Sequence, residues 1–515
     1  MTERCKPGRD QNLKPAPGVS TRLASSKVYD SERPDIPRIW PWKYRGRSGF
    51  KTVLSRAGLM ALVIAMGLAS VPARAWSDGD ELAHQPKSEY QARRHRLMEQ
   101  LKDGIVVLIG AQEDEFGEVG RFRQKNDFMY LTGCETPSAY LMLIPAGLIP
   151  DRPAEETLFL PPRNMFQEKW TGPQIGPGPE AESKFGIQAV VSSEEFYGRL
   201  LSVLMGTPFK REGRRFQAAN KLYTLVPQGS AASITREAQF VDLIHQVAPH
   251  VSVASITPVL GEMRKVKSAA EAQVLQTAVD ITAEAHHDAA LAIKPGVYEH
   301  KVQAVVEDAF TRNGSERPGY PSIIGSGINS TVLHYNENHK KIDPGDLVVV
   351  DVGAEYSYYT ADLTRTYPAS GKFTDRQREV YQLVLDAQRA AEKAYKPGVN
   401  LADLNRAAIE VMKASPLRDK QGNTLERYFI HGLGHWLGMD VHDVGEYSKP
   451  IPAGAVFTIE PGIYIPEEKL GVRIEDNYMA TDTGLIKLSA KIPSEAADVE
   501  KAMAAHAPQG HSASR

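Results

Sequence analysis

Cysteine is nearly absent from this chain of 515 residues. Only Cys5 and Cys134 occur, so disulfides cannot organise the fold, and no Cys-x-x-Cys pair exists for a zinc or redox site. An excess of one charge is also lacking, because 61 Lys and Arg nearly balance 63 Asp and Glu. The net charge of -2 therefore gives no indication of a nucleic-acid partner, and none is expected.

The composition that remains is that of a globular protein. With 42% hydrophobic and 24% charged residues, the chain is neither mainly disordered nor collagenous nor a polytopic membrane protein. Its length predicts two to four domains, each large enough to bury a core of its own.

An apolar run at residues 57–71 indicates export. It follows Lys51 and Arg56 and precedes Ala73-Arg74-Ala75, an A-x-A cleavage pattern. Because bilayer-spanning helices need about 20 apolar residues, this shorter run favours a cleaved signal peptide over an anchor. We therefore predict a leader and signal peptide over residues 1–75, and a periplasmic or secreted protein.

Residues 76–260 are predicted to form an α/β domain. A helical pattern begins at Tyr90, and a helix is expected over 192–206. Strand-like apolar runs are expected at 104–111, 128–133, 139–145, 157–162 and 251–259. Alternation of the two patterns is typical of a layered α/β fold.

A second domain is predicted from a boundary near Gly261 to residue 492, with residues 493–515 left as a tail. Ser268 with Glu271, and Thr374 with Gln377, are capping-box patterns that each open a long helix. Each helix is followed by Lys-Pro-Gly-Val, at 294–297 and 396–399, and then by another helical pattern.

The second domain repeats itself. The segment 342–353 resembles 451–462, which places Asp351 opposite Glu460, and His334 corresponds to His442. The order helix, Lys-Pro-Gly-Val, helix, histidine, apolar strand and carboxylate thus occurs twice. We interpret this as an internal duplication whose halves pack face to face around one site.

Four carboxylates in two related hairpins predict a metal site. Asp351 and Asp362 belong to the first hairpin, and Glu460 and Glu475 to the second. Ionised and unpaired, these groups would repel one another, so they require protons or cations. Their number exceeds what one cation needs, which indicates two divalent ions about 3.5–4 Å apart.

His435 is the fifth predicted ligand. It follows His431 by four positions, but Gly432 and Gly434 disfavour a helix, and no glutamate completes an H-E-x-x-H motif. We therefore expect a loop or strand here. One imidazole with four carboxylates suits manganese, with zinc or cobalt as alternatives.

The motifs around these residues resemble a known family. They are HYNEN at 334–338, DLTRT at 362–366, HGLGHWLGMDVHD at 431–443, EPGIY at 460–464 and RIED at 473–476. Their order resembles the metallopeptidases of pita-bread fold, and most of all the Xaa-Pro aminopeptidases (aminopeptidase P). Residues 121–133 are similar to the amino-terminal domain shared with prolidase and creatinase. The resemblance implies an α/β (α+β) fold with a creatinase-like amino-terminal α/β domain and a pseudo-two-fold pita-bread catalytic domain.

The resemblance also implies roles. Asp351 would chelate one metal, Asp362 and Glu475 would bridge both, and His435 with Glu460 would complete the other, with a bridging hydroxide as nucleophile. Glu460 would also relay a proton to the departing proline nitrogen. By the same resemblance, the other residues predicted to act in catalysis or to bind substrate are His334, His431, His442, Tyr464 and Arg473. Peptides with proline in second position would be the substrates, and a dimer or tetramer is expected.

Alternative functions remain open at this point. Prolidase, which cuts only Xaa-Pro dipeptides, shares several motifs. A non-catalytic binding protein on the same fold would show eroded ligands, whereas all five stand here. Two features depart from the family: a short stretch between Glu460 and Glu475, and a signal peptide on a usually cytosolic enzyme type. Outside the site, we expect Arg365 to be a structural ion-pair partner, His286 and His287 to be structural or solvated, and Cys134 to be an inert buried thiol.

Overall fold

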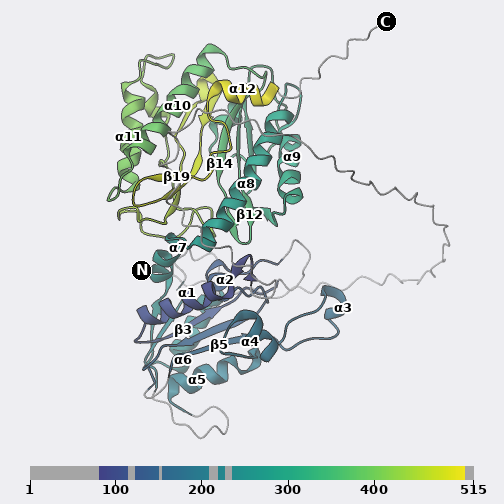
Figure 1. Cartoon of the computed structure of the whole chain (residues 1–515), viewed down its shortest axis with the longest axis vertical. Helices are drawn as coiled ribbons and strands as arrows, with labels where there is room; N and C mark the ends of the chain where they lie inside the picture. The colour runs from purple at the N-terminus through teal and green to yellow at the C-terminus, as the bar shows by residue number, and fades with distance from the viewer. Residues whose placement is uncertain (1–80, 114–121, 150–152, 208–217, 227–234, 505–515) are drawn as a thin grey trace, which may run out of the picture. The chain divides into compact units, whose positions relative to one another are not determined.

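The computed structural model describes residues 81–113, 122–149, 153–207, 218–226 and 235–504 (Figure 1). The predicted signal peptide lies outside these ranges, so export stays a prediction. Within them, none of the helices combines the length and apolar character needed to cross a bilayer.

A mixed sheet of six strands forms the amino-terminal layer, in the order β6-β5-β4-β3-β7-β8. Its strands are β3 (Ile105–Ile109), β4 (Tyr140–Ile144), β5 (Glu155–Leu160), β6 (Ala189–Ser192), β7 (Lys221–Thr224) and β8 (Ser252–Ser255). The central strand β3 pairs antiparallel with β4 and parallel with β7. A short hairpin, β1 (Glu81–Leu82) and β2 (Gln85–Pro86), precedes this layer.

Helices cover both faces of this sheet, which explains why β3 is apolar at every position. Successive side chains of a strand point to opposite faces. Ile105 and Val107 join a cluster that contains Phe196, whereas Val106 joins a cluster that contains Leu97. The helices of this part are α1 (Lys87–Gln100), α2 (Asn126–Thr132), α3 (Glu168–Thr171), α4 (Pro179–Phe185), α5 (Phe196–Met205) and α6 (Arg236–Val247).

Two strand predictions in this domain were wrong. Residues 128–133, expected as a strand, belong to helix α2, which ends at Gly133 with a left-handed φ of 62°. The helix is buried from Phe128 to Thr132, so its apolar run carries no helical period to read. In the run 251–259 only Ser252–Ser255 are a strand, because Pro258 stands in the first turn of helix α7 (Thr257–Lys265).

The predicted domain boundary near Gly261 falls within α7. The position of the domain boundary therefore stays a prediction. The predicted tail, residues 493–515, contains helix α12 (Ala496–Ala504), whose Val499 is fully buried in the core of the second domain. Only Ala496 and Val499 of this helix are buried, which gives too little periodicity to reveal it.

The second domain has two halves of like order, as the duplication predicted. Helices α8 (Ala269–Ala292) and α9 (Glu299–Arg312) pack together in the first half, and α10 (Asp375–Ala394) and α11 (Leu401–Ala414) in the second (Figure 1). Both predicted capping boxes are present, at Ser268 and at Thr374.

Each half contributes a three-stranded antiparallel sheet. The first is β10 (Ile323–Ser326), β11 (Leu347–Val352) and β14 (Leu363–Pro368), and the second is β15 (Val456–Ile459), β18 (Asp476–Ala480) and β19 (Leu485–Lys487). Further strands complete the halves: β9 (Arg317–Pro318), β12 (Ala354–Tyr356), β13 (Tyr359–Thr360), β16 (Gly462–Ile465) and β17 (Leu470–Arg473). A backbone bridge between Thr364 and Glu475 joins the two sheets.

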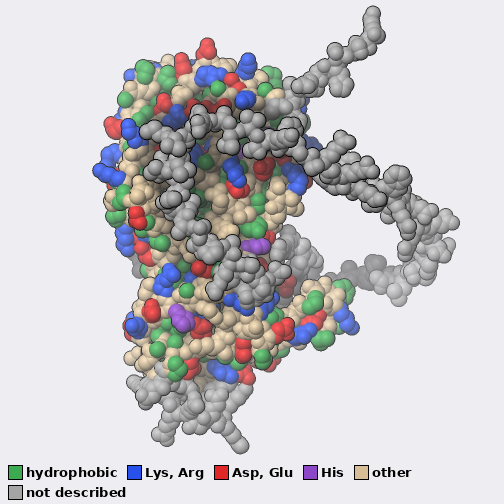
Figure 2. Space-filling model, viewed as in Figure 1, with side chains coloured by type: hydrophobic (Ala, Val, Ile, Leu, Met, Phe, Trp, Pro, Cys, Tyr) green, Lys and Arg blue, Asp and Glu red, His purple; other side chains and the backbone are tan. Residues whose placement is uncertain are grey.

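On the surface seen in Figure 2, basic and acidic side chains are interspersed over the described part of the chain. That face carries no broad area of a single sign, in agreement with the near-zero net charge. The chemistry of the protein is therefore sought in its cavities.

The capping boxes give a first prediction. Ser268→Ala removes the hydroxyl that accepts from the backbone N–H of Glu271 at 3.3 Å, and should lower the free energy of unfolding by about 1 kcal/mol. Urea titration of the purified protein measures this. Thr277→Ala in the exposed middle of α8 is the control and should be neutral or slightly stabilising, because alanine favours helix. Equal losses in both variants would contradict the prediction.

Candidate active site

Four carboxylates meet where the strands of the two halves end. Asp351 lies in β11, Asp362 directly precedes β14, Glu460 directly follows β15, and Glu475 lies between β17 and β18. Because β11 pairs with β14 and β15 pairs with β18, each half presents two acids at one edge. The bridge from Thr364 to Glu475 then brings the edges together.

These acids line a cavity of about 560 Å³. Nine of the ten residues predicted for the site line it: His334, Asp351, Asp362, His431, His435, His442, Glu460, Arg473 and Glu475. The tenth, Tyr464, lies behind its wall, where its hydroxyl is 2.9 Å from His431 Nε2. Residues spread over positions 334 to 475 thus line or border one cavity.

Burial makes this cluster costly as a set of free anions. Burial raises the pKa of Glu460 to about 8 and that of Glu475 well above its usual range, and neighbouring carboxylates add to both effects. The pKa of Asp351 is raised by the same two causes, in spite of its ion pair with Arg473. The cavity therefore needs protons or cations.

Tyr320, which the sequence did not single out, bridges two of the acids. Its hydroxyl oxygen lies 2.7 Å from Asp351 Oδ1 and 2.6 Å from Asp362 Oδ1. A phenol carries one proton and can donate to only one of these oxygens at a time. The second short contact again requires a proton or a cation among the carboxylates.

His435 stands against the acids of both halves. Its Nε2 is 3.2 Å from Asp362 and 3.4 Å from Glu460. Burial alone would lower its pKa, but the hydrogen bond to Asp362 and the charges of both acids raise it to about 9. The segment 431–436 is not helical, as expected, and a Cβ at Gly434 would lie 2.0 Å from the carbonyl oxygen of Thr458. Glycine is thus required for His435 to approach the second sheet.

The donor set fits a divalent cation. Ligand atoms of Asp362, His435 and Glu475 all lie within 4.8 Å of one another. Glu475 Oε2 accepts from Thr364 at 2.7 Å, whereas its Oε1 is buried without a hydrogen-bond partner. Oxygen-rich sites with one imidazole suit manganese and related ions.

Asp351 and Glu460 stand apart from that group of three. Asp351 Oδ2 is held by Arg473 at 2.5 Å, and Glu460 faces His435. Asp351 is thus paired with an arginine, whereas Glu460 contacts His435, which belongs to the group of three. Their prediction as ligands stays a prediction.

A chain of hydrogen bonds fixes His431. Arg473 Nη1 donates to the Tyr464 hydroxyl at 2.9 Å, and that hydroxyl lies 2.9 Å from His431 Nε2. His431 Nδ1 lies 2.8 Å from the carbonyl oxygen of Gly432, to which it can only donate. Burial and the charge of Arg473 lower the pKa of His431 to about 4, so the ring is neutral and Nε2 accepts from Tyr464.

His334 and His442 are held differently. Their ring centroids lie 6.3 Å apart, and the His442 ring stands edge-on to that of His435 at 4.2 Å. Among the described residues, no hydrogen bond involves the side chain of His334 or His442. Both rings therefore keep their nitrogens available to a ligand in the cavity.

Sequence reasoning missed several supporting residues. Besides Tyr320, they are Thr364, which bonds Glu475 and accepts from Arg473 Nε at 3.1 Å, and Thr458, whose hydroxyl accepts from the His435 N–H at 3.0 Å. Asn477 pairs with the backbone of Asp362. Their partners are distant in sequence, and threonine or asparagine in a strand carries no local signal.

The residues expected to be structural are so. Arg365 is fully buried and pairs with Asp476 at 2.7 Å. His286 is buried beside Tyr367, and burial lowers its pKa to about 3. Burial also raises the pKa of the Cys134 thiol to about 11, which leaves it unreactive at neutral pH.

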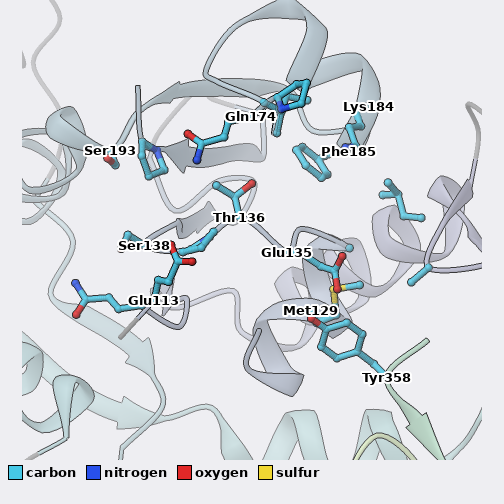
Figure 3. A pocket seen from close by; sticks show the side chains of 18 of the residues that line it. Glu113, Met129, Glu135, Thr136, Ser138, Gln174, Lys184, Phe185, Ser193 and Tyr358 are labelled. Carbon is cyan, nitrogen blue, oxygen red and sulfur yellow. The ribbon is translucent and has the colours of Figure 1, made fainter. Parts of the chain in front are cut away.

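A larger cavity of about 1230 Å³ lies mainly in the amino-terminal domain (Figure 3). The side chains labelled there come from several elements and include two acids, Glu113 and Glu135, together with Lys184, Phe185 and Tyr358. It contains none of the residues predicted for the site. The smaller cavity, which combines buried acids with imidazoles, is therefore the candidate active site.

Comparisons with known proteins agree with this choice. The sequence profile of metallopeptidase family M24 matches residues 273–482, and that of the aminopeptidase P N-terminal domain matches residues 90–209. Xaa-Pro aminopeptidase of Escherichia coli is 33% identical over 449 residues, which are 81% of this chain and 98% of that protein. Human Xaa-Pro dipeptidase is 30% identical over 494 residues, covering 83% of this chain and 95% of that protein.

Solved structures show the same likeness. Proline aminopeptidase P II from Yersinia pestis matches with a TM-score of 0.71 and 30% identity, over 81% of this chain and 99% of that one. Zinc-substituted Escherichia coli aminopeptidase P in complex with product matches with a TM-score of 0.71 and 32% identity, over 81% and 98%. The predicted two-domain fold with a pita-bread catalytic domain is confirmed. The chain therefore belongs to metallopeptidase family M24 and has the two-domain organisation of the aminopeptidase P enzymes.

Proposed function

We propose that the protein is an exported dinuclear-metal exopeptidase that hydrolyses the bond between the first residue of a peptide and a proline in second position. One observation carries the proposal. The cavity gathers Asp362, His435 and Glu475, with one buried glutamate oxygen left without a partner, in a chain that resembles Xaa-Pro aminopeptidase over most of its length.

Five residues would hold the cations: Asp351, Asp362, His435, Glu460 and Glu475. Manganese is the proposed ion, with zinc or cobalt as alternatives, because this donor set does not distinguish them. When bound, divalent cations would lower the pKa of a coordinated water molecule and polarise the scissile carbonyl.

The chain's own histidines would bind and orient the peptide. His334 and His442 have no hydrogen bond of their own among the described residues, so they can donate to the scissile carbonyl region. His431 shapes the same wall, while its tautomer is set by Tyr464 and Gly432. Arg473 keeps Tyr464 oriented toward His431.

Proline gives the reaction its chemical character. Its nitrogen carries no hydrogen, and its ring fixes φ, so enzymes that read an extended backbone bind Xaa-Pro bonds badly. After the bond breaks, the proline nitrogen must gain a proton. The Glu460 carboxyl, which lines the cavity beside His435, is the group proposed to deliver it.

Prolidase activity is the second candidate. The chain is 30% identical to human Xaa-Pro dipeptidase over 95% of that protein, which supports prolidase activity almost as much as the 33% identity to Escherichia coli Xaa-Pro aminopeptidase supports aminopeptidase activity. Both enzymes need the same cations and histidines, and they differ in whether a residue beyond proline is accepted. A non-catalytic binding role is less supported, because every predicted ligand lies in or beside one cavity.

Export and assembly are part of the proposal. The apolar run at 57–71 with its A-x-A site supports secretion or a periplasmic location. A homodimer or homotetramer is proposed from the family resemblance alone.

The substrate is tested with protein that starts at Trp76, stripped of metal and reloaded with manganese. We expect cleavage of a peptide Xaa-Pro-Yaa at the Xaa-Pro bond, because all five proposed ligands line the cavity. Product release is followed by chromatography and mass spectrometry. Glu460→Ala, which removes a ligand and the proton donor, should lower kcat by about 100-fold or more.

Two outcomes would change the conclusion. Cleavage of an Xaa-Pro dipeptide alone would make the protein a prolidase. Inactivity on both substrates with manganese, zinc and cobalt would favour a binding role.

The metal is tested by Glu475→Gln. This change removes the buried carboxylate with the unpartnered oxygen, and should reduce bound manganese by at least one ion per chain in elemental analysis. Manganese at about 100 times its Kd should stabilise the unaltered protein by about 2.7 kcal/mol, and this gain should shrink in the variant. Glu467→Gln, on an exposed turn, is the control and should bind as before. Unchanged manganese content in Glu475→Gln would exclude the proposed ligand set.

A further inference from the structure

The segment that carries His442 has no regular structure. Residues 437–446 form neither helix nor strand, and the His442 ring makes no hydrogen bond among the described residues. Its edge-on contact with His435 at 4.2 Å does not by itself fix a ring. The position of His442 therefore depends on what holds the residues beside it.

Asp443, the next residue, is held on every side. Its side chain is only 1% exposed. Its Oδ1 accepts from Arg264 Nη2 at 2.6 Å, and its Oδ2 accepts from Lys267 Nζ at 3.1 Å. Its backbone N–H donates to the carbonyl oxygen of Trp436 at 2.8 Å. Two cations and a backbone bond thus fix the chain directly after His442.

Arg264 holds this segment at a second point. The same Nη2 donates to Asp440 at 2.7 Å, so the guanidinium contacts a carboxylate on either side of His442. Arg264 stands in the last turn of α7, and its side chain is 3% exposed. A planar guanidinium with several fixed donors can hold two acids at once, which a lysine cannot do with the same geometry.

The amino-terminal domain completes the arrangement. Arg264 Nη1 donates to Asp127 at 2.8 Å, and Asp127 lies in the first turn of α2. Its neighbour Asn126 donates from Nδ2 to the carbonyl oxygen of Met439 at 3.0 Å. Helix α2 therefore contacts the His442 segment both directly and through Arg264.

The Asp443 and Lys267 side chains pack closely against the backbone at Gly438. A Cβ at Gly438 would lie 2.0 Å from Asp443 Oδ2 and 2.9 Å from Lys267 Nζ. Burial works against the charge of Asp443, but Arg264 and Lys267 outweigh it and keep the pKa of that carboxyl below its usual range. Arg264, Lys267 and Asp443 are thus buried charges in contact, whereas Asp440 is 48% exposed. Removing one of the buried partners leaves the others uncompensated.

We propose that Arg264, anchored to Asp127 of the amino-terminal domain, is a positioning residue that sets the placement of His442 through Asp440 and Asp443. Neither Arg264 nor Asp443 is among the described residues that line the cavity. The inference rests on the proposed function, because it assigns His442 to the substrate. In this proposal the amino-terminal domain contributes to catalysis indirectly, because its Asp127 anchors Arg264.

The test compares two buried arginines changed in the same way. Arg264→Lys should lower kcat on Xaa-Pro-Yaa roughly 10- to 100-fold with a smaller change in KM, because a displacement of about 1 Å costs that much. Arg94→Lys is the matched control. Arg94 is also buried and pairs with a carboxylate, Glu156, but it lies entirely within the amino-terminal domain. It should lower thermal stability and leave kcat within twofold.

A double-mutant cycle separates positioning from general destabilisation. In a His442→Ala background, Arg264→Lys should change kcat/KM by less than twofold, because the imidazole ring that Arg264 positions is no longer present. Single-turnover assays at high enzyme concentration supply the rate where His442→Ala is slow. Effects that multiply independently in the double variant would overturn the proposal, and so would an unchanged kcat in Arg264→Lys.

Asp127→Asn applies the same cycle if Arg264→Lys does not fold. The Asp127 side chain is 17% exposed, so its loss costs less stability than loss of the arginine. The variant should lower kcat several-fold in the normal background and leave it within twofold in His442→Ala. A normal kcat in Asp127→Asn would overturn the part assigned to the amino-terminal domain. Failure of the unaltered enzyme to cleave Xaa-Pro-Yaa would instead overturn the proposed function itself.

Discussion

Mutual repulsion among buried carboxylates is the constraint on which this protein is built. Asp351, Asp362, Glu460 and Glu475 lie at strand ends in one cavity, and burial raises the pKa of three of them. Such a cluster is tolerated only with compensating charge. Within the chain, His435 and Arg473 compensate the carboxylates with positive charge, and the Tyr320 hydroxyl does so with a hydrogen bond. A bound cation would supply the remaining positive charge. Each half of the domain contributes two of these acids, and the packing of the halves brings all four together.

The sequence allowed much of this to be predicted where the signal was local. Capping boxes at Ser268 and Thr374, strand-end acids and the glycines around His435 are patterns of neighbouring residues, and the structure has each of them. Helix α2 was mistaken for a strand because Phe128–Thr132 are buried at every position, which hides the helical period. Tyr320, Thr364 and Arg264 were missed because their partners are 31 to 179 positions away. Single sequences do not record such contacts.

Two kinds of support hold the histidines of the cavity. His431 is oriented by a chain of neutral and charged donors from Arg473 through Tyr464, which also fixes its tautomer. His442 has no such chain and depends on charges that flank it along the backbone. When a ring is fixed by its own hydrogen bond, the nitrogen in that bond is no longer available to substrate. A ring fixed through its neighbours keeps both nitrogens for substrate, which suits His442, whose ring stands edge-on to that of His435.

The seam between the halves has a consequence for how the protein matures. Thr364 and Glu475 are 111 positions apart, and their contact forms only after the last strands have been made and folded. Contacts of such long range form late in folding. The three residues that could hold a cation, Asp362, His435 and Glu475, come from both sides of this seam, so the site is complete only once the seam has formed.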